Sequence, residues 1–344
     1  MGFRDARISR SIIRAIFHQT NPKDATLVGR ILAFFSFLQL LLIRFRPRVF
    51  EHLRKDVWKL DEDEYRESFR SADKSGGSLK PVGDLGYSGS TFFTTPNSKY
   101  LIKSLPRAFE YEFFMEDLCD KYVEHMTNNP NSLLVRITDF LEAIGPAIGS
   151  WIGTAPAHHV VMENVLYGKE TDEQQDKWET YDLKPSSYFY PERDLAGGRL
   201  APDSVKERLV DHFPDKMRLS PHDHAELIKL LEADTALLRS ANAVDYSLFL
   251  VRYPAEPARE VSSPAANERS WRNGVLSRDG KWVYRAVVLD FFWAKHKMQP
   301  KLMTKLIRSF NFFAHKGPMS ITTTPDEYRG RFLEMVQGYI EASE

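Results

Sequence analysis

The sequence predicts an α+β protein built from two lobes. Its 344 residues, 42% of them hydrophobic, are enough to bury large cores and suggest two domains or a single two-lobed unit. A β-hairpin is predicted in the first half, over Gly83–Leu105, and a second around Asp279-Gly280. Helical periodicity follows the first hairpin and precedes the second, so each half combines antiparallel strands with helices.

The first lobe is expected to span residues 45–163. Apolar residues at helical spacing predict a helix over Pro47–Phe69, and the helix after the hairpin runs from Phe109 to the Asn-Asn-Pro sequence at 128–130. Two strand-like runs follow, SLLVRITDFLEAI and HHVVMENVL, joined by a turn rich in glycine, proline and alanine. We place the lobe boundary near Glu163–Tyr167.

The second lobe is expected to span residues 164–344. Leucines at helical spacing predict a helix over Pro221–Asn242, which leads into the strand-like run VDYSLFLVRYP. Residues 254–270 are rich in proline, alanine, serine and glutamate, which is typical of a flexible insertion. The sequence contains no internal repeat.

Residues 1–44 form a basic and apolar N-terminal extension in this reading. Residues 1–55 hold eleven lysines and arginines against three acids, although the whole chain has no net charge. The uncharged run Ile31–Ile43 has thirteen residues, too few to cross a hydrocarbon core, and it starts too late for a signal peptide. It is either a buried element or an interfacial membrane anchor. The single cysteine, Cys119, excludes an intrachain disulfide framework and suggests a reducing, cytoplasmic location.

A glycine-serine turn opens the first hairpin, and a lysine lies near the end of its second strand. The turn contains Gly86, Ser88, Gly89 and Ser90, and the lysine is Lys103. Free N–H groups in such a turn can form an anion-binding concavity, and a nearby lysine supplies positive charge. Phosphate is therefore one candidate ligand, although most glycine-serine turns bind nothing.

Acidic residues follow in an order that suits phosphoryl transfer. Glu112, or its neighbour Glu110, could point from the helix back at Lys103, although surface acids on helices usually face water. Asp245 begins one predicted strand and Asp290 follows another. ATP-dependent phosphoryl transfer needs a phosphate loop, a lysine, an acid near the attacking hydroxyl and a carboxylate for Mg²⁺. These parts occur here in that order, but aspartates in such places also serve as turn or capping residues.

Protein-kinase signatures are missing, because the chain has no His-Arg-Asp, Asp-Phe-Gly or Ala-Pro-Glu sequence and no Walker lysine loop. Over roughly residues 45–336, however, it resembles the phosphatidylinositol phosphate kinase family. SGSTFF, YLIKSL and EYEFF are similar to the family's nucleotide loop, lysine strand and following helix. The remaining similar stretches are NNPNSLLVRITDFLEA, VVMENVL, YDLKPSS, VDYSLFLV, VVLDFF and ITTTPDEYRGRFLEMV.

The resemblance implies a bilobal lipid-kinase fold with an antiparallel sheet and helices in each lobe, and ATP and Mg²⁺ as cofactors. It also implies roles for individual residues: Gly86, Ser88, Gly89 and Ser90 around the triphosphate; Lys103 on the α/β-phosphates, paired with Glu112; Asp245 at the inositol hydroxyl; Asp182 and Lys184 beside the transferred phosphate; Asp290 on Mg²⁺.

The implied substrate is a phosphoinositide at a membrane surface. Residues 311–324 would form the activation segment that selects the lipid, with His315 and Lys316 meeting headgroups, unless the segment is an ordinary solvated loop. The implied enzyme is a cytoplasmic, peripheral membrane protein that binds no nucleic acid. In the family the N-terminal edge can mediate homodimers.

Some positions depart from the family pattern. Pro185 replaces the glycine of the Asp-Leu-Lys motif, and Glu163 replaces an asparagine. Lys316 is the only lysine of the activation segment, and Arg193 could stand in for a phosphate-side arginine. Two hypotheses therefore remain: an active lipid kinase of the phosphatidylinositol 4-phosphate 5-kinase type, or a degenerate member that binds nucleotide or phosphoinositide as a scaffold. A soluble inositol phosphate kinase is a more distant third.

Overall fold

The computed structural model describes residues 3–17, 41–70, 79–82, 90–143, 156–185, 211–255, 269–294 and 323–341. The chain divides into two compact units. The first comprises Met1–Tyr111, Met126–Pro130 and Val135–Tyr167, and the second Glu112–His125, Asn131–Leu134 and Gly168–Glu344. Each unit combines helices with antiparallel strands, so the fold class is α+β, as predicted.

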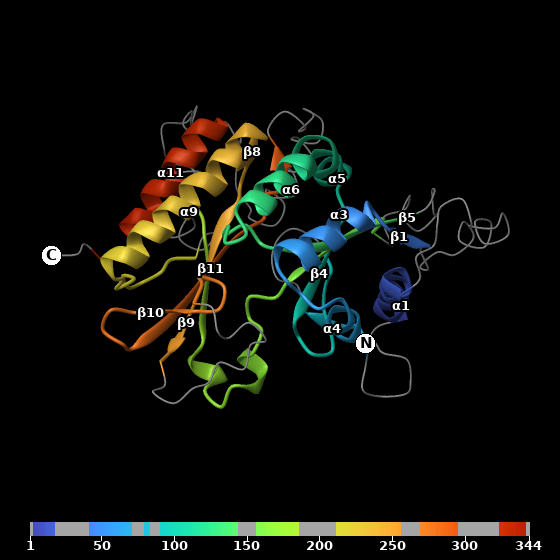
Figure 1. The fold of residues 1–344 in the computed structure, drawn as a ribbon, viewed down its shortest axis with the longest axis horizontal. Coiled ribbons are helices and arrows are strands. Elements are labelled where there is room, and N and C mark those ends of the chain that lie inside the picture. Colours follow the sequence, from blue (N-terminus) through green and yellow to red (C-terminus); the bar gives the residue numbers. More distant parts are fainter. Residues whose placement is uncertain are drawn as a thin grey trace, which may run out of the picture. The chain divides into compact units, whose positions relative to one another are not determined.

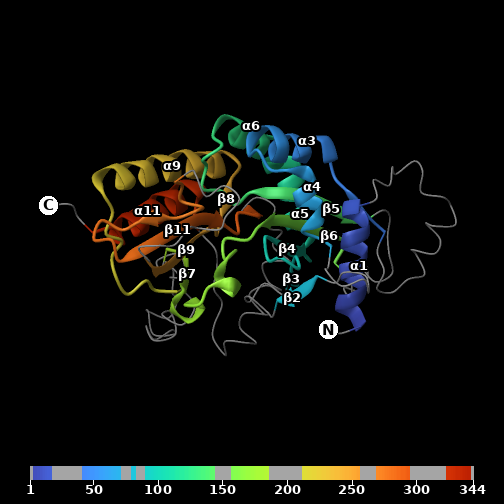
Figure 2. The same ribbon diagram turned by 60° about the horizontal axis from the view of Figure 1, so that its bottom comes forward.

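The first unit is built on a six-stranded sheet in which all neighbours run antiparallel. Its strands, in spatial order, are β1 (Leu42–Arg44), β5 (Ile137–Ala143), β6 (His158–Glu163), β4 (Tyr100–Leu105), β3 (Phe92–Thr94) and β2 (Lys80–Val82). β3 and β4 form the hairpin predicted from the sequence, and Figure 2 shows them beside β2.

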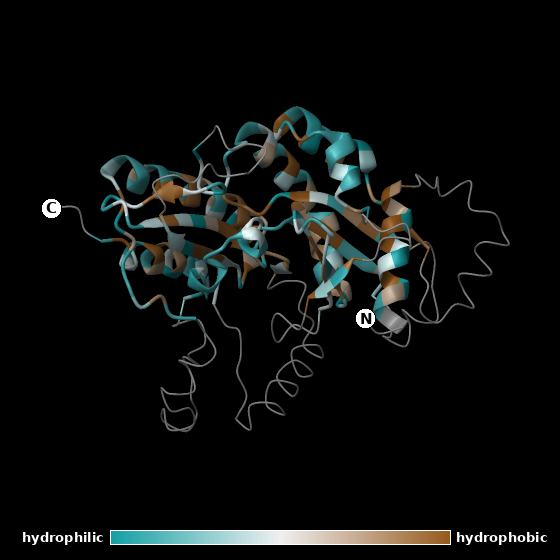
Figure 3. Cartoon of the chain, turned by 90° about the horizontal axis from the view of Figure 1, so that it is seen from below, coloured by the Kyte–Doolittle hydropathy of each residue, from teal (hydrophilic) through white to brown (hydrophobic). Residues whose placement is uncertain are grey.

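Helix α1 (Phe3–Phe17) belongs to the core of the first unit. Its residues Ile8 and Ile12 are buried in one cluster with Ile102 of β4 and Val161 of β6. The helix alternates hydrophobic and hydrophilic bands, as expected of a helix that covers a sheet (Figure 3). Within this unit α1 packs against the core and β1 pairs with β5 at the edge of the sheet; the expected extension over residues 1–44 is described only in these parts.

Of the two other helices predicted in the first part of the chain, one is broken and one is continuous. Pro47–Phe69 does not form one helix but contains α3 (Pro47–His52), a π-helical turn (Leu53–Val57) and α4 (Glu62–Glu67). The break occurs because Asp61 caps a new helix, its side chain accepting a hydrogen bond of 2.7 Å from the Glu64 amide. By contrast, the predicted helix from Phe109 is continuous through α5 (Ala108–Phe113), a π-helical turn (Phe114–Leu118) and α6 (Cys119–Asn128).

The second unit contains a four-stranded antiparallel sheet with two long helices. The strands are, in spatial order, β10 (Val275–Leu276), β11 (Trp282–Leu289), β9 (Ser247–Pro254) and β7 (Glu179–Leu183). A two-stranded ladder joins β8 (Ala243–Val244) to β12 (Trp293–Ala294), and 3₁₀ turns lie at Lys169–Thr171 and Gln175–Lys177. Helices α9 (Pro221–Ser240) and α11 (Pro325–Gly338) pack side by side (Figure 1). The predicted helix over Pro221–Asn242 and the hairpin at Asp279-Gly280 are both confirmed.

No helix within the described ranges is both long and apolar enough to span a membrane. The apolar run Ile31–Ile43 falls outside the described residues except at its end, where Leu42 and Ile43 enter β1. Most of the predicted insertion at 254–270 also lies outside them.

Two adjacent histidines of β6 make the first unit sensitive to acid. Burial lowers the pKa of His158 to about 4, and burial together with His158 lowers that of His159 to about 3. Neither ring nitrogen of His159 has a hydrogen-bond partner within the described part of the chain. The folded state therefore holds both rings neutral, whereas the unfolded chain takes up protons near pH 6.5.

We expect the free energy of unfolding to fall as the pH drops below about 6.5, by about 1.4 kcal/mol per pH unit for each neutral histidine. The variant His159→Leu should lose less stability between pH 7 and pH 5 than the wild type, because it removes one of the two proton acceptors. Urea unfolding at several pH values measures this difference. Equal pH slopes for variant and wild type would show that His159 is not held neutral.

Candidate functional site

Lys103 lies in β4 and is 7% exposed. Its Nζ atom is 5.8 Å from the ring centroid of Phe92 on the paired strand β3. Lys103 shares a sheet face with Leu105, which pairs with His158 of β6. Tyr111 of α5 stacks on His158 with ring centroids 3.7 Å apart. Helix α5 therefore covers the sheet face that carries Lys103.

Glu110 and Glu112 of α5 are the two candidate partners of this lysine, and they differ in burial. Glu110 is 2% exposed and accepts a hydrogen bond of 3.2 Å from Arg107, whereas Glu112 is exposed. A carboxylate is kept in a buried position only where cations or donors compensate it. The buried acid at the start of this helix is thus Glu110, and the resemblance had favoured Glu112.

The nucleotide loop is described only at its end. Ser90 is 5% exposed and lies directly before the hairpin, where the Thr91 amide donates a 2.6 Å hydrogen bond to Ser104 of β4. Gly86, Ser88 and Gly89 lie outside the described residues.

In the second unit, two β-ladders bring Asp245 and Asp290 close together. β9 pairs with β11 from Ser247 onward, and β8 pairs with β12 up to Val244. Asp245 lies in the short link between β8 and β9, and Asp290 lies in the short link between β11 and β12. Because the same two chain segments are paired on both sides of these links, the two aspartates are held in one gap between the ladders.

Both aspartates have a left-handed backbone conformation. The φ angle is 65° at Asp245 and 60° at Asp290. Residues other than glycine rarely adopt this conformation, although aspartate and asparagine tolerate it better than most. Such residues persist where the surrounding structure holds them, and they concentrate at functional sites.

Strand β7 supplies the other two charged groups. It pairs with β9, placing Asp182 opposite Phe249. Lys184 follows directly after the strand, and its Nζ atom lies 3.2 Å from Oδ1 of Asp245. The side chains of Lys184 and Asp245 are 16% and 21% exposed, so the pair is partly shielded from water.

The charges of this cluster influence one another. Burial alone would lower the pKa of Lys184, but the carboxylates of Asp245, Asp290 and Asp182 outweigh burial and raise it. Burial, reinforced by Asp290, raises the pKa of Asp182, and Lys184 counteracts only part of this. Oδ1 of Asp182 is buried without a hydrogen-bond partner within the described residues. Lys184 is thus a permanent cation surrounded by carboxylates that outnumber it.

Comparison with known proteins identifies the family. The sequence model described as PIP5K, Phosphatidylinositol-4-phosphate 5-Kinase, matches residues 74–273, more than half of the chain. The chain belongs to this family. Its members include a "Probable phosphatidylinositol phosphate kinase" of Dictyostelium discoideum, which is 30% identical over 212 residues, covering 60% of this chain and 27% of the relative.

Two further relatives carry the name of the family. The "Phosphatidylinositol 4-phosphate 5-kinase" of Plasmodium falciparum is 24% identical over 294 residues, which is 77% of this chain and 16% of the relative. The "Phosphatidylinositol 4-phosphate 5-kinase type-1 beta" of Gallus gallus is 26% identical over 206 residues, 60% of this chain and 34% of the relative. This phosphatidylinositol phosphate kinase family member therefore spans only 16% to 34% of the length of these relatives.

The family match includes Lys103, Asp182, Lys184 and Asp245 but ends before Asp290. Asp290 joins the cluster by geometry, because the β8–β12 ladder places it next to Asp245 and its charge acts on Lys184 and Asp182. The predicted activation segment, with His315 and Lys316, lies outside the described residues except for its last two positions.

The residues of this cluster fit a divalent cation. Carboxylate oxygens are the ligands that Mg²⁺ prefers. The Asp182 oxygen that has no hydrogen-bond partner among the described residues and the nearby Asp290 offer such oxygens, and a cation would offset both the burial and the charge of Asp290 that raise the pKa of Asp182. Asp182 and Asp290 are therefore the residues able to hold it.

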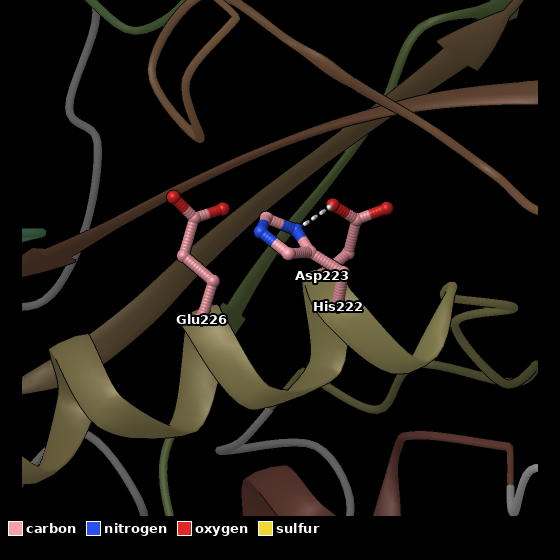
Figure 4. Close-up of side chains that lie close together, drawn as sticks. All are labelled: His222, Asp223 and Glu226. Atoms are coloured by element: carbon pink, nitrogen blue, oxygen red, sulfur yellow. Dashed lines mark ion pairs between the residues drawn. The ribbon is translucent and has the colours of Figure 1, made fainter.

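A second group of possible metal ligands is found in the first turn of α9. His222, Asp223 and Glu226 present their ligand atoms within 4.8 Å of one another (Figure 4). Arg269 already forms ion pairs with Asp223 and Glu226, and Asp223 also accepts a 2.7 Å hydrogen bond from the Ser220 hydroxyl. Because a guanidinium group already compensates these carboxylates, the group is accounted for as a helix-capping arrangement without a metal.

Tyr328 lies in the closing segment ITTTPDEYRGRFLEMV, where the tyrosine is part of the family resemblance, but the sequence assigns it no role. Its hydroxyl donates a hydrogen bond to the backbone carbonyl of Tyr246, the residue after Asp245. A tyrosine on an amphipathic helix gives no sequence signal of such a contact, because the partner is a backbone atom about eighty positions away.

Proposed function

We propose that this protein transfers the γ-phosphate of Mg·ATP to the inositol ring of a phosphatidylinositol phosphate, as a phosphatidylinositol 4-phosphate 5-kinase. The observation that carries the proposal is the 3.2 Å contact between Lys184 and Asp245 beside two further carboxylates, Asp182 and Asp290. Phosphoryl transfer is mostly positioning and charge neutralisation, and this cluster offers a fixed cation, a candidate base and metal-binding oxygens.

In this proposal Asp245 orients the attacking inositol hydroxyl and accepts its proton. Lys184 contacts Asp245 and would also lie beside the transferred phosphate, so it would hold that carboxylate in place and balance negative charge that develops during transfer. Asp290, together with Asp182, would hold Mg²⁺, which neutralises charge on the nucleotide phosphates when bound.

In this proposal the first unit binds the nucleotide. Lys103 would contact the α/β-phosphates, and the loop of Gly86, Ser88, Gly89 and Ser90 would cover the triphosphate. We assign the supporting acid to Glu110 rather than Glu112, since Glu110 is the buried one of the two. In this proposal its carboxylate pairs with Lys103 and holds that lysine in place between turnovers.

The membrane-related parts of the proposal rest on the sequence. Residues 311–324, including His315 and Lys316, would meet the lipid surface from the cytoplasmic side. A homodimer formed through the N-terminal edge stays a prediction.

The alternative is a scaffold that binds nucleotide or phosphoinositide without transferring phosphate. Pro185 supports it, because this residue is buried, directly follows Lys184 and has no backbone N–H to offer a phosphate. The contact between Lys184 and Asp245 favours the active enzyme. A protein that only binds nucleotide or lipid does not need a partly shielded carboxylate held beside a cation, whereas phosphoryl transfer does.

The test is ATP-dependent labelling of lipid. The purified protein is incubated with γ-labelled ATP, Mg²⁺ and vesicles that contain each phosphatidylinositol monophosphate in turn, with a water-soluble inositol phosphate as a separate arm. A labelled bisphosphate in one lipid arm is expected and identifies the substrate. No product in any arm, with nucleotide or vesicle binding intact, would exclude the enzyme and leave the scaffold; label in the soluble arm alone would point to a soluble inositol phosphate kinase.

A further inference from the structure

Helix α11 contacts the backbone directly after Asp245. The Tyr328 hydroxyl donates a hydrogen bond to the carbonyl oxygen of Tyr246, and both tyrosines are fully buried. Their rings meet edge to face, with centroids 4.7 Å apart and planes at 76°. Phe332, one turn further along α11, contacts the Tyr246 ring in the same way at 4.9 Å.

The Tyr328 hydroxyl is held in a fixed position because α11 is anchored at its start and along its length. Thr324 and Glu327 form a capping box, with hydrogen bonds of 3.2 and 2.8 Å between side chain and backbone. Arg329 donates to the Thr235 hydroxyl at 3.1 Å and to the Glu232 carbonyl at 3.3 Å, both on α9. Figure 1 shows the two helices lying side by side.

The hydrogen bond from Tyr328 is made next to a residue with an unfavourable backbone conformation. Asp245 has φ 65°, and the link of residues 245–246 lies between the β8–β12 and β9–β11 ladders. A carbonyl in such a link gains no ladder partner, and a buried carbonyl must be satisfied elsewhere. The Tyr328 hydroxyl satisfies it and so restricts the left-handed link that orients Asp245.

We propose that Tyr328 is a positioning residue for phosphoryl transfer, which acts through the Tyr246 carbonyl to hold the Asp245 carboxylate in its productive orientation. This inference rests on the proposed function and deepens it, because it makes α11 part of the catalytic apparatus although the helix lies beyond the residues matched by the family. The tyrosine itself touches neither nucleotide nor lipid in this proposal.

The test compares Tyr328→Phe with Tyr339→Phe in the full chain. Tyr328→Phe removes one hydroxyl and keeps the ring contacts with Tyr246. Tyr339→Phe is the matched control, since its hydroxyl also makes a hydrogen bond at the end of α11, 3.1 Å from His212 and away from Asp245. We expect Tyr328→Phe to lower kcat about tenfold with unchanged KM for ATP and lipid, because misplacing a catalytic group slows chemistry more than binding. The control should keep wild-type kcat.

Hydrogen exchange supplies a readout that does not depend on activity. In Tyr328→Phe the amides of residues 243–250 should exchange faster than in the wild type, while other peptides stay unchanged. Wild-type kcat and wild-type exchange in this variant would overturn the inference and leave the proposed function intact. Faster exchange throughout the chain would also overturn it, by showing a general structural role. If the wild type transfers no phosphate, the proposed function fails, and exchange in 243–250 alone decides whether Tyr328 holds the Asp245 link.

Discussion

Replacing Lys184 by methionine should lower phosphoryl transfer about 1,000-fold, the loss typical when a preorganised charge is removed from a transition state. Lys184 is the cation that contacts Asp245 at 3.2 Å, and Asp290 and Asp182 also act on it. Methionine keeps the length of the side chain but removes the charge. The three carboxylates then repel one another with no cation to compensate their charge. This repulsion favours protonation of one of them, so the acid that must accept the inositol proton is less available. Initial rates with saturating ATP and lipid measure the effect.

Lys121→Met is the matched control for this variant. Lys121 belongs to the same unit and donates a 2.7 Å hydrogen bond to the Ser240 carbonyl, so its loss removes a charge and a contact elsewhere. Its rate should stay within about twofold of the wild type, since surface substitutions away from a site have small effects. A Lys184→Met rate equal to that of the control would remove Lys184 from the catalytic apparatus.

Asp139→Asn should produce the largest loss of stability, about 3–5 kcal/mol in the free energy of unfolding. Asp139 of β5 is fully buried and accepts hydrogen bonds from Arg44 at 3.0 and 2.7 Å and from the Tyr65 hydroxyl at 2.7 Å. A second guanidinium, that of Arg54, lies 3.2 Å from it and is 1% exposed. The substitution preserves the shape of the side chain but leaves two buried cations with less negative charge to compensate them. Urea unfolding measures the change.

Glu67→Gln serves as the comparison for Asp139→Asn. Glu67 and Arg70 form an exposed ion pair in the same unit, with side chains 57% and 60% exposed. Exposed pairs contribute little, so the free energy of unfolding should change by about 0.5 kcal/mol or less. Similar losses for the two variants would show that burial of the Asp139 network does not matter for the fold.

Local sequence patterns predicted the elements that carry the candidate site. The hairpin of β3 and β4, the helix from Phe109, and the strands beside Asp245 and Asp290 follow from apolar periodicity and turn residues. The order of these elements also placed Lys103, Asp245 and Asp290 in a sequence suited to phosphoryl transfer. Periodicity is set by neighbours in the chain, which is why it could be read without the fold.

Features that depend on distant residues could not be predicted in this way. The choice between Glu110 and Glu112 depends on how α5 rotates against the sheet, and both positions read equally well as helix. The left-handed backbone of Asp245 and Asp290 arises because two ladders pair on either side of them. The sequence of α1 indicates only a basic N-terminal segment, because the strands whose face buries Ile8 and Ile12 come much later in the sequence.

The most direct measurement of the central claim is the initial rate of γ-phosphate transfer to vesicles of phosphatidylinositol 4-phosphate by the wild type and by Asp290→Asn. The account predicts labelled bisphosphate from the wild type and a rate at least about 100-fold lower from the variant, because the carboxylate that would hold Mg²⁺ becomes a neutral amide. Equal rates, in samples with matching far-UV circular dichroism, would contradict the assignment of this cluster as the site of phosphoryl transfer.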